Sequence, residues 1–440
     1  MKTNFETENI TTLFFKFAIP GILGMLIVSA QMMIDGAFLG RFVGPLGLAG
    51  VNLSMPLVNL LMSVGLMICI GGGVIASIYR GNKKINNSQE IATITLSLLF
   101  IVLEVLSIII ILNLDFFIKF LGANKEIYSY VKDYLFILIL GTFLFTSPIF
   151  TETFVRIEEK PNYVFLSGVV GLIVNISLDY LFIVKLNLGM KGGALATIIA
   201  TTCSFLALIS NIKFKKPKNL KEYKTDIKNI FYNGSSEMLT VVASTVATYL
   251  FNRVIMAKVG VLGVSALTII FYINQILNIS LYGLSQALQP IVAYNVGAKN
   301  IEKIKKVLKI SFISGGTLGV IVYIGSHIFG IEIIKIFAKE NQELILLADE
   351  ALFFISFAYL LEFINIISSS FLTAIERPLE SVIVSLCRSI IFVTIPLFIL
   401  PNIIGPKGIW MTTPIAEFLC LLVSFYLMKK SINSLKRRLG

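Results

Sequence analysis

The sequence predicts an all-α integral membrane protein with twelve transmembrane helices in two six-helix lobes. Hydrophobic residues make up 56% of the chain and charged residues only 14%. A water-soluble chain of 440 residues could not bury that much apolar surface. The apolar runs reach the roughly 20 residues needed to cross a bilayer. Backbone groups in lipid must be paired within their own segment, which favours helices over open sheet.

The apolar runs give twelve expected spans. The first six cover about residues 14–39, 46–78, 90–113, 128–152, 162–184 and 190–211, and the second six cover about 229–257, 262–294, 304–330, 345–375, 378–401 and 406–430. Several runs exceed the length needed to cross, so those helices are expected to tilt or to extend into the interface.

The two halves of the chain repeat one another at an offset of 216 residues. Residues 44–52 read GPLGLAGVN and residues 260–268 read GVLGVSALT. Glycines and lysines at segment ends also coincide: Gly81 with Gly297, Lys83 with Lys299, Lys119 with Lys335, Gly189 with Gly405 and Lys191 with Lys407. An even number of spans in each half gives both halves the same direction, so the two pseudo-symmetric lobes form a parallel repeat.

The repeat predicts three segments: an amino-terminal lobe over residues 1–212, a basic linker over 213–228 and a carboxyl-terminal lobe over 229–440. A central cavity is the expected place for a solute. Most Lys and Arg residues lie in alternate loops and in the tails, which places both termini in the cytoplasm. The net charge of +12 therefore reflects topology, and no nucleic-acid partner is expected. No signal peptide is expected.

Four polar residues of the first lobe are expected at a similar depth beneath the outer boundary. Asp35 lies near the outer end of the first span, Asp179 near that of the fifth, and Thr197 near that of the sixth. Asn175 precedes Asp179 by four residues and shares its helix face. These groups could hold a proton or a small hard cation, because both accept oxygen ligands. The alternative is a hydrogen-bonded cluster that only joins the helices.

Five motifs carry a family resemblance across nearly the whole chain: DGAFLGRFVGPLGLAGVNLSMP (35–56), GGGVIASIYRGNKK (71–84), NISLDYLFIVKLNLGMKGGALAT (175–197), QPIVAYNVGAKN (289–300) and AIERP (374–378). With these motifs the chain resembles the MATE (multidrug and toxic compound extrusion) family, in its MepA-like and DinF-like bacterial branches. The resemblance implies two six-helix lobes and cation-coupled antiport, with H⁺ or Na⁺ driving multidrug efflux of organic, often cationic, compounds by alternating access.

The resemblance also assigns roles to residues. Asp35, Asn175, Asp179 and Thr197 match polar positions of the cation or proton network in DinF-like members, so a Na⁺ site there is one reading. Glu362 matches an acidic position of NorM-like members, whereas Glu237 looks like a feature of the MepA-like branch. Either acid is a candidate for binding cationic cargo or for ion coupling in the second lobe. Glu104, Glu417, Arg253 and Arg388 also lie within spans. Glu104 and Glu417 match no motif, Arg253 lies near an outer end, and Arg388 lies deeper, where it could counter one of the second-lobe acids.

Other expectations follow from the same resemblance. The protein is expected in the bacterial inner or plasma membrane as a monomer, with membrane lipid around it and small-molecule drugs or toxic organic cations as cargo. It is expected to be no enzyme and to hold no cofactor besides the coupling ion. The main alternative is a flippase for a lipid-linked precursor, as in more distant relatives of this fold. The sequence leaves H⁺ and Na⁺ open.

The charge asymmetry makes a prediction about topology. A reporter enzyme that is active only outside the cytoplasm should give no signal when fused after Gly440, because both termini are expected inside. The same reporter fused in an expected outer loop, after Lys125, serves as the positive control. Strong activity of the carboxyl-terminal fusion would reverse the predicted orientation.

Overall fold

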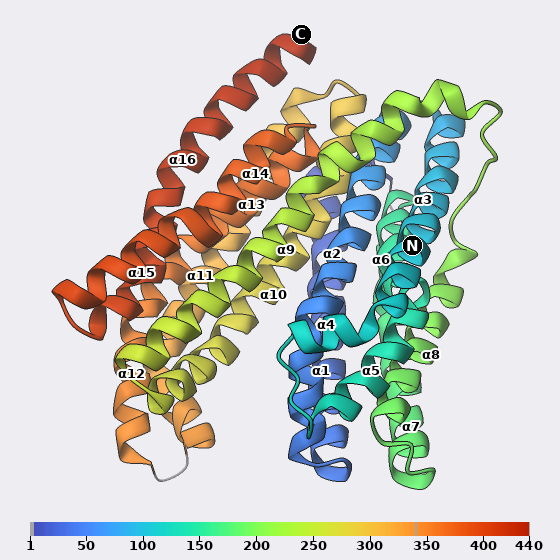
Figure 1. Cartoon of the computed structure of the whole chain (residues 1–440). Coiled ribbons are helices and arrows are strands. Elements are labelled where there is room, and N and C mark those ends of the chain that lie inside the picture. Colours follow the sequence, from blue (N-terminus) through green and yellow to red (C-terminus); the bar gives the residue numbers. More distant parts are fainter. Residues whose placement is uncertain (1–3, 339–340, 440) are drawn as a thin grey trace. The chain divides into compact units, whose positions relative to one another are not determined.

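The computed structural model describes residues 4–338 and 341–439, and within these ranges the chain forms helices joined by turns and loops, without strands (Figure 1). The chain divides into two compact units, Met1–Met238 and Leu239–Gly440. The division falls inside α9 (Lys224–Lys258), so the first turns of this helix belong to unit 1. The lobe boundaries expected from the sequence, which also include residues 1–3 and 440 outside the described part, stay a prediction.

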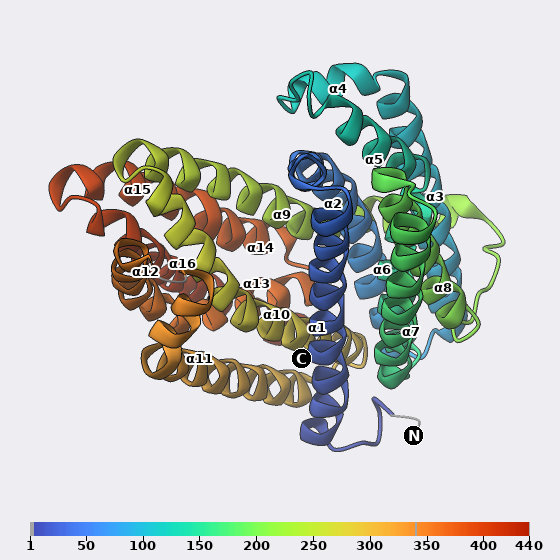
Figure 2. The same ribbon diagram turned by 90° about the horizontal axis from the view of Figure 1, so that it is seen from below.

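Unit 1 contains eight α-helices before α9, within the described residues. They are α1 (Ile10–Phe42), α2 (Pro45–Gly81), α3 (Ile85–Leu112), α4 (Leu114–Phe120), α5 (Tyr128–Leu140), α6 (Thr142–Ile157), α7 (Pro161–Asp179) and α8 (Gly189–Ile209). A π-helix, η1 (Tyr180–Lys185), continues α7, and a short 3₁₀ helix, η2 (Leu220–Tyr223), precedes α9. Figures 1 and 2 show α1 alongside α7, which brings the first span next to the fifth.

Unit 2 is also built of long and short helices. After the second part of α9 come α10 (Val261–Gly297), α11 (Ile301–Ala338), α12 (Gln342–Ile355), η3 (Ser356–Leu360), α13 (Glu362–Ala374), α14 (Pro378–Leu386), η4 (Cys387–Ile391), α15 (Phe392–Ile403) and α16 (Lys407–Leu439). Of the short elements, η3 is a 3₁₀ helix and η4 is a π-helix.

Among the residues that the structure describes, the expected twelve spans correspond to ten helices long and apolar enough to cross a membrane and to two bent pairs. The first pair joins α5 to α6 at Gly141 with a bend of 53°. The second joins α12 and η3 to α13 at Leu361 with a bend of 42°. The sequence predicts continuous spans at both places, because the apolar pattern runs on through the breaks. The second bend places Glu362 in the first turn of α13.

The internal repeat is visible in the backbone itself. Both α2 and α10 have 37 residues and begin after a glycine with positive φ, Gly44 at 97° and Gly260 at 83°. Three further turns use left-handed residues in both units: Lys83 (62°) and Lys299 (54°), Glu159 (63°) and Glu376 (60°), Gly189 (54°) and Gly405 (71°). Left-handed backbone is costly for residues other than glycine. Its recurrence at corresponding places therefore indicates that the two units share one chain path.

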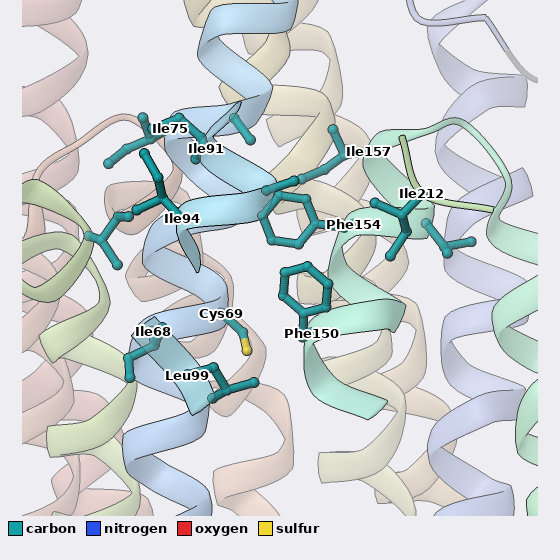
Figure 3. Close-up of a cluster of buried hydrophobic side chains, with 14 of the residues drawn as sticks. Ile68, Cys69, Ile75, Ile91, Ile94, Leu99, Phe150, Phe154, Ile157 and Ile212 are labelled. Carbon is teal, nitrogen blue, oxygen red and sulfur yellow. The ribbon is translucent and has the colours of Figure 1, made fainter. Parts of the chain in front are cut away.

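Each unit has a packed interior and an apolar exterior. In unit 1 the Phe150 and Phe154 rings of α6 stack with centroids 4.6 Å apart, next to Ile68 and Cys69 of α2 (Figure 3). In unit 2 the largest fully buried side chain is Trp410. Large apolar side chains are nevertheless exposed along many helices of both units. Apolar faces of this extent are typical of contact with lipid, so the chain is a multi-pass membrane protein.

The basic segment before α9 is fastened to unit 1. The Tyr223 hydroxyl donates to Glu90 at 2.5 Å, the Tyr79 hydroxyl donates to Asp226 at 2.9 Å, and the Thr93 hydroxyl donates to the backbone oxygen of Lys215 at 2.9 Å. The segment that the sequence predicts as a linker is thus attached to α2 and α3 at several points.

Glycines bring α9 into backbone contact with α2. A Cβ added at Gly234 would lie 1.8 Å from the Met67 oxygen, and one added at Gly71 would lie 2.0 Å from the Ile230 oxygen. No side chain fits at either position without displacing backbone. The first turns of α9 are therefore held against α2 by an approach that only glycine allows.

The glycine contact makes a prediction about stability. Gly234→Ala should lower the stability of the folded protein by about 1–3 kcal/mol, the usual cost of overpacking. Gly24→Ala in α1 is the matched control, since a Cβ there meets no atom within 4 Å. Thermal unfolding in detergent would measure both variants, and equal transition temperatures would contradict the close approach.

Candidate functional site

The unit 1 polar cluster consists of Asp35, Asn175, Asp179 and Thr197, and the structure brings all four together. Asp35 comes from α1, Asn175 and Asp179 from adjacent turns of α7, and Thr197 from α8. The Thr197 hydroxyl lies 3.4 Å from Asp35 Oδ2 and also donates to the Gly193 oxygen at 3.0 Å. Asp35 further interacts with Asn175 and Asp179. Pairing of α1 with α7 and α8 thus joins residues 162 positions apart in the chain.

The unit 1 polar cluster is buried and only partly satisfied. Asn175 and Asp179 are completely buried. Five of the cluster's buried atoms lack a hydrogen-bond partner among the described residues: Asp35 Oδ1, Asn175 Nδ2 and Oδ1, and Asp179 Oδ1 and Oδ2. An unsatisfied buried polar atom costs about 1–3 kcal/mol. Carboxylate, amide and hydroxyl oxygens of this kind are the ligands that a hard cation prefers.

A fifth residue belongs to this site and was missed at the sequence level. Tyr134 of α5 is 7% exposed and lies close enough to Asp35 and Asp179 to interact electrostatically with both. Its neighbours Tyr128 and Tyr130 share the same span, so residue type alone does not single it out. Neither acid of the cluster forms an ion pair within the described ranges. Both carboxylates therefore lack a basic side chain as a partner there.

Unit 2 contains a second buried cluster of different chemistry. We refer to Glu362, Arg388 and Glu417 as the unit 2 triad. Arg388, on η4, donates from Nη2 to Glu362 Oε1 and from Nε to Glu417 Oε1, the latter at 2.6 Å. Glu362 and Glu417 are each 4% exposed. The sequence marks Glu362 as a candidate and Arg388 as a countercharge for a second-lobe acid, and the structure joins both to Glu417, to which the sequence gives no role.

The far side of Glu417 is also held. Asn365 of α13 donates to Glu417 Oε2 at 2.6 Å and to the Glu417 backbone oxygen at 3.0 Å. The Ser424 hydroxyl in turn donates to Asn365 Oδ1 at 2.7 Å. Both carboxylate oxygens of Glu417 therefore have partners from the protein, which fixes the side chain that supports Arg388.

The remaining candidates are on other helices. Glu237 is on α9, within the turns that belong to unit 1, and is partly buried. It is therefore in a different unit from Glu362. Glu104 is partly buried on α3, and Arg253 is exposed on the second part of α9. No group of three or more His, Cys, Asp or Glu side chains suited to a metal ion occurs in the described ranges.

Relatives in sequence and structure agree on the family. The MatE family model matches residues 20–181 and 237–399. The multidrug export protein MepA of Staphylococcus haemolyticus is 24% identical over 441 residues, which cover 99% of this chain and 96% of that protein. MepA of Staphylococcus aureus strain MRSA252 is 23% identical over 436 residues, which cover 96% of this chain and 94% of that protein.

Two solved structures show the same fold. A variant of the Vibrio cholerae MATE transporter VcmN superposes with a TM-score of 0.89 at 16% identity over 97% of both chains. A MOP superfamily transporter from Pyrococcus furiosus superposes with a TM-score of 0.91 at 19% identity over 99% of both chains.

These findings define the class of the protein. Membrane-spanning helices in two similar units, with polar clusters buried among them, make it a membrane transporter and not an enzyme. The chain belongs to the MATE family, matched over both halves of its length.

The contacts around Glu417 make a prediction about stability. Asn365→Leu should destabilise the protein by about 1–3 kcal/mol, because it leaves a buried carboxylate oxygen and the Ser424 hydroxyl without their partner. Asn252→Leu, at an exposed position of α9, is the matched control. Unfolding in denaturant gives the free energy of unfolding of both variants. An unchanged free energy of unfolding for Asn365→Leu would show that this contact contributes nothing to stability.

Proposed function

We propose that the protein is a multidrug efflux antiporter that exports organic, often cationic, compounds in exchange for H⁺ or Na⁺ by alternating access. Support for export of drugs comes from the relatives named multidrug export protein, which align over nearly the whole chain. Support for cation coupling comes from one observation in unit 1: five buried polar atoms lack partners among the described residues, and three of them belong to two carboxylates that have no ion-pair partner there.

In this mechanism the unit 1 polar cluster is the coupling site. Two adjacent carboxylates repel one another, so uptake of one positive charge stabilises the pair. Asn175 and Thr197 supply the further oxygen atoms that a proton relay or a sodium ion uses. The ion drives transport only if its affinity differs between the conformations open to the two sides of the membrane, because equal affinity shifts no equilibrium.

The charges favour a cationic cargo over a lipid-linked precursor. The unit 1 polar cluster carries two acids, and the unit 2 triad carries two acids for one base. An anionic diphosphate headgroup would be repelled by both clusters, whereas an organic cation would be attracted. We place the protein in the bacterial plasma membrane with both termini in the cytoplasm. A monomer without nucleic-acid partners remains our expectation.

The coupling role of Asp35 can be tested in proteoliposomes. Ethidium export is measured under a pH gradient and, separately, under a sodium gradient, and the gradient that drives export identifies the ion. Asp35→Asn and Asp179→Asn should each lower gradient-driven export by about tenfold or more, because either change removes one of the two charges that capture the ion.

Two comparisons make the result decisive. Asp115→Asn changes an exposed acid on α4 and should leave export unchanged. Thr197→Val keeps both acids and removes one oxygen, so a smaller loss is expected than in the Asp variants. Full gradient-driven export by Asp35→Asn would refute coupling at this cluster.

A further inference from the structure

The basic segment, residues 213–228 between α8 and α9, concentrates positive charge at one end of unit 1. It contains seven lysines against two acids, Glu222 and Asp226. Lys215 lies with its Nζ 3.9 Å from Glu90 Oε1. The other six lysines are exposed and form no ion pair among the described residues: Lys213, Lys216, Lys218, Lys221, Lys224 and Lys228. The segment therefore carries a surplus of positive charge that the described acids of unit 1 do not neutralise.

The basic segment is held in a defined shape. Besides its hydrogen bonds to α2 and α3, it contains the short helix η2, which begins after Asn219. The Asn219 Oδ1 accepts a hydrogen bond from the Lys221 backbone N–H at 3.1 Å. At the start of the segment the Phe214 ring stacks on the Phe150 ring, with centroids 6.2 Å apart. An ordered segment loses less conformational entropy when it binds a partner.

The basic segment lies beside helices that face lipid. Figures 1 and 2 show it at the outer edge of unit 1, next to α3 and α8. Both helices are long and apolar enough to cross a membrane. Ile85, the first residue of α3, is 53% exposed, and Leu206 near the end of α8 is 59% exposed. Lysines that directly follow or precede such helices reach the depth of phospholipid headgroups.

An apolar side chain accompanies these lysines. Leu220 is the first residue of η2, lies between Lys218 and Lys221 in the sequence, and is 59% exposed. One exposed leucine alone is ordinary. Stable attachment to a membrane surface, however, combines positive charge with an inserted apolar group. An acidic partner in water would use the lysines and leave Leu220 without a contact, so the combination favours a lipid surface.

We propose that the basic segment binds the headgroups of anionic phospholipids. Lys216, Lys218 and Lys221 pair with the phosphates, and Leu220 inserts among the upper acyl carbons. Because the segment is hydrogen-bonded to α2 and α3 and leads directly into α9, the bound lipid also holds the start of α9 at this depth. This inference goes beyond the proposed function, since it uses neither the coupling ion nor the cargo.

Brominated lipids provide the test, because bromine quenches tryptophan fluorescence at short range. Leu220→Trp places a reporter at an exposed position, and the single natural tryptophan, Trp410, is completely buried and supplies the background. The full chain is placed in nanodiscs of phosphatidylglycerol and phosphatidylcholine at one fixed composition, with bromine on either lipid. Quenching should show phosphatidylglycerol enriched about fivefold or more beside the reporter, since one lysine near an anionic surface contributes about that factor.

Charge variants in the Leu220→Trp background test the role of the lysines. Changing Lys216, Lys218 and Lys221 together to glutamine should return the lipid ratio beside the reporter to that of the bulk bilayer. Changing the same three residues to arginine should keep the enrichment, because a guanidinium group also pairs with phosphate. All three lysines and Leu220 are exposed, so these variants leave the packed interior of unit 1 intact.

A matched control removes the same number of exposed lysines at the other ends of α3 and α7, by changing Lys119, Lys125 and Lys185 to glutamine. This control should keep the enrichment. Sodium chloride should reduce the enrichment by screening, and inorganic phosphate at equal ionic strength should reduce it no further.

Three results would overturn the inference. The first is equal enrichment of both lipids beside the reporter. The second is enrichment that survives the triple glutamine change in the basic segment. The third is displacement by inorganic phosphate beyond the effect of salt, because the ligand would then be a free anion and not a bilayer lipid. Export assays of the Asp35 variants do not enter this test, so the proposed function stands or falls separately.

Discussion

Hydrocarbon offers no hydrogen bonds, so each polar group within a span must find its partner inside the protein. This constraint explains why the buried acids are so informative. In unit 2 it is met from within, since Arg388 and Asn365 occupy most of the oxygens of Glu362 and Glu417. In unit 1 it is not met by the chain, since both oxygens of Asp179 lack partners among the described residues. The same physical demand thus produces one cluster whose acids are mostly paired within the protein and one whose acids are not.

The two units share one chain path and differ in their buried charged residues. The left-handed turns at Gly44 and Gly260, and at Lys83 and Lys299, occur at corresponding positions. The buried acids do not occupy corresponding positions, because Asp35 and Asp179 lie on α1 and α7 while Glu362 and Glu417 lie on α13 and α16. Backbone geometry has been kept while chemistry has diverged, as expected when turns determine the fold and side chains determine the function.

The spans could be predicted from the sequence because apolar run length is a local property, and the unit 1 polar cluster could be predicted because its residues lie at similar distances from the outer ends of their spans. Apolar run length identifies spans, and the spacing of Asn175 and Asp179 places them on one helix face. The bends at Gly141 and Leu361 could not be predicted from the sequence, because apolar residues continue through both breaks. Arg388 could be predicted as a countercharge for a second-lobe acid, but the part of Glu417 in the triad could not, because it comes from a separate helix and its pairing with Arg388 is visible only after packing. Tyr134 was missed for the same reason.

The fastening of the basic segment has a consequence for where the chain can be divided. Lys218 and Asn219 are exposed and look like a natural cutting point. A fragment beginning there would nevertheless carry Tyr223 and Asp226, whose hydrogen-bond partners Glu90 and Tyr79 remain on the other fragment. Two fragments produced as separate polypeptides would therefore keep these hydrogen-bonding groups as a shared contact. Cleavage of this loop by a protease would leave the same hydrogen bonds in place between the fragments.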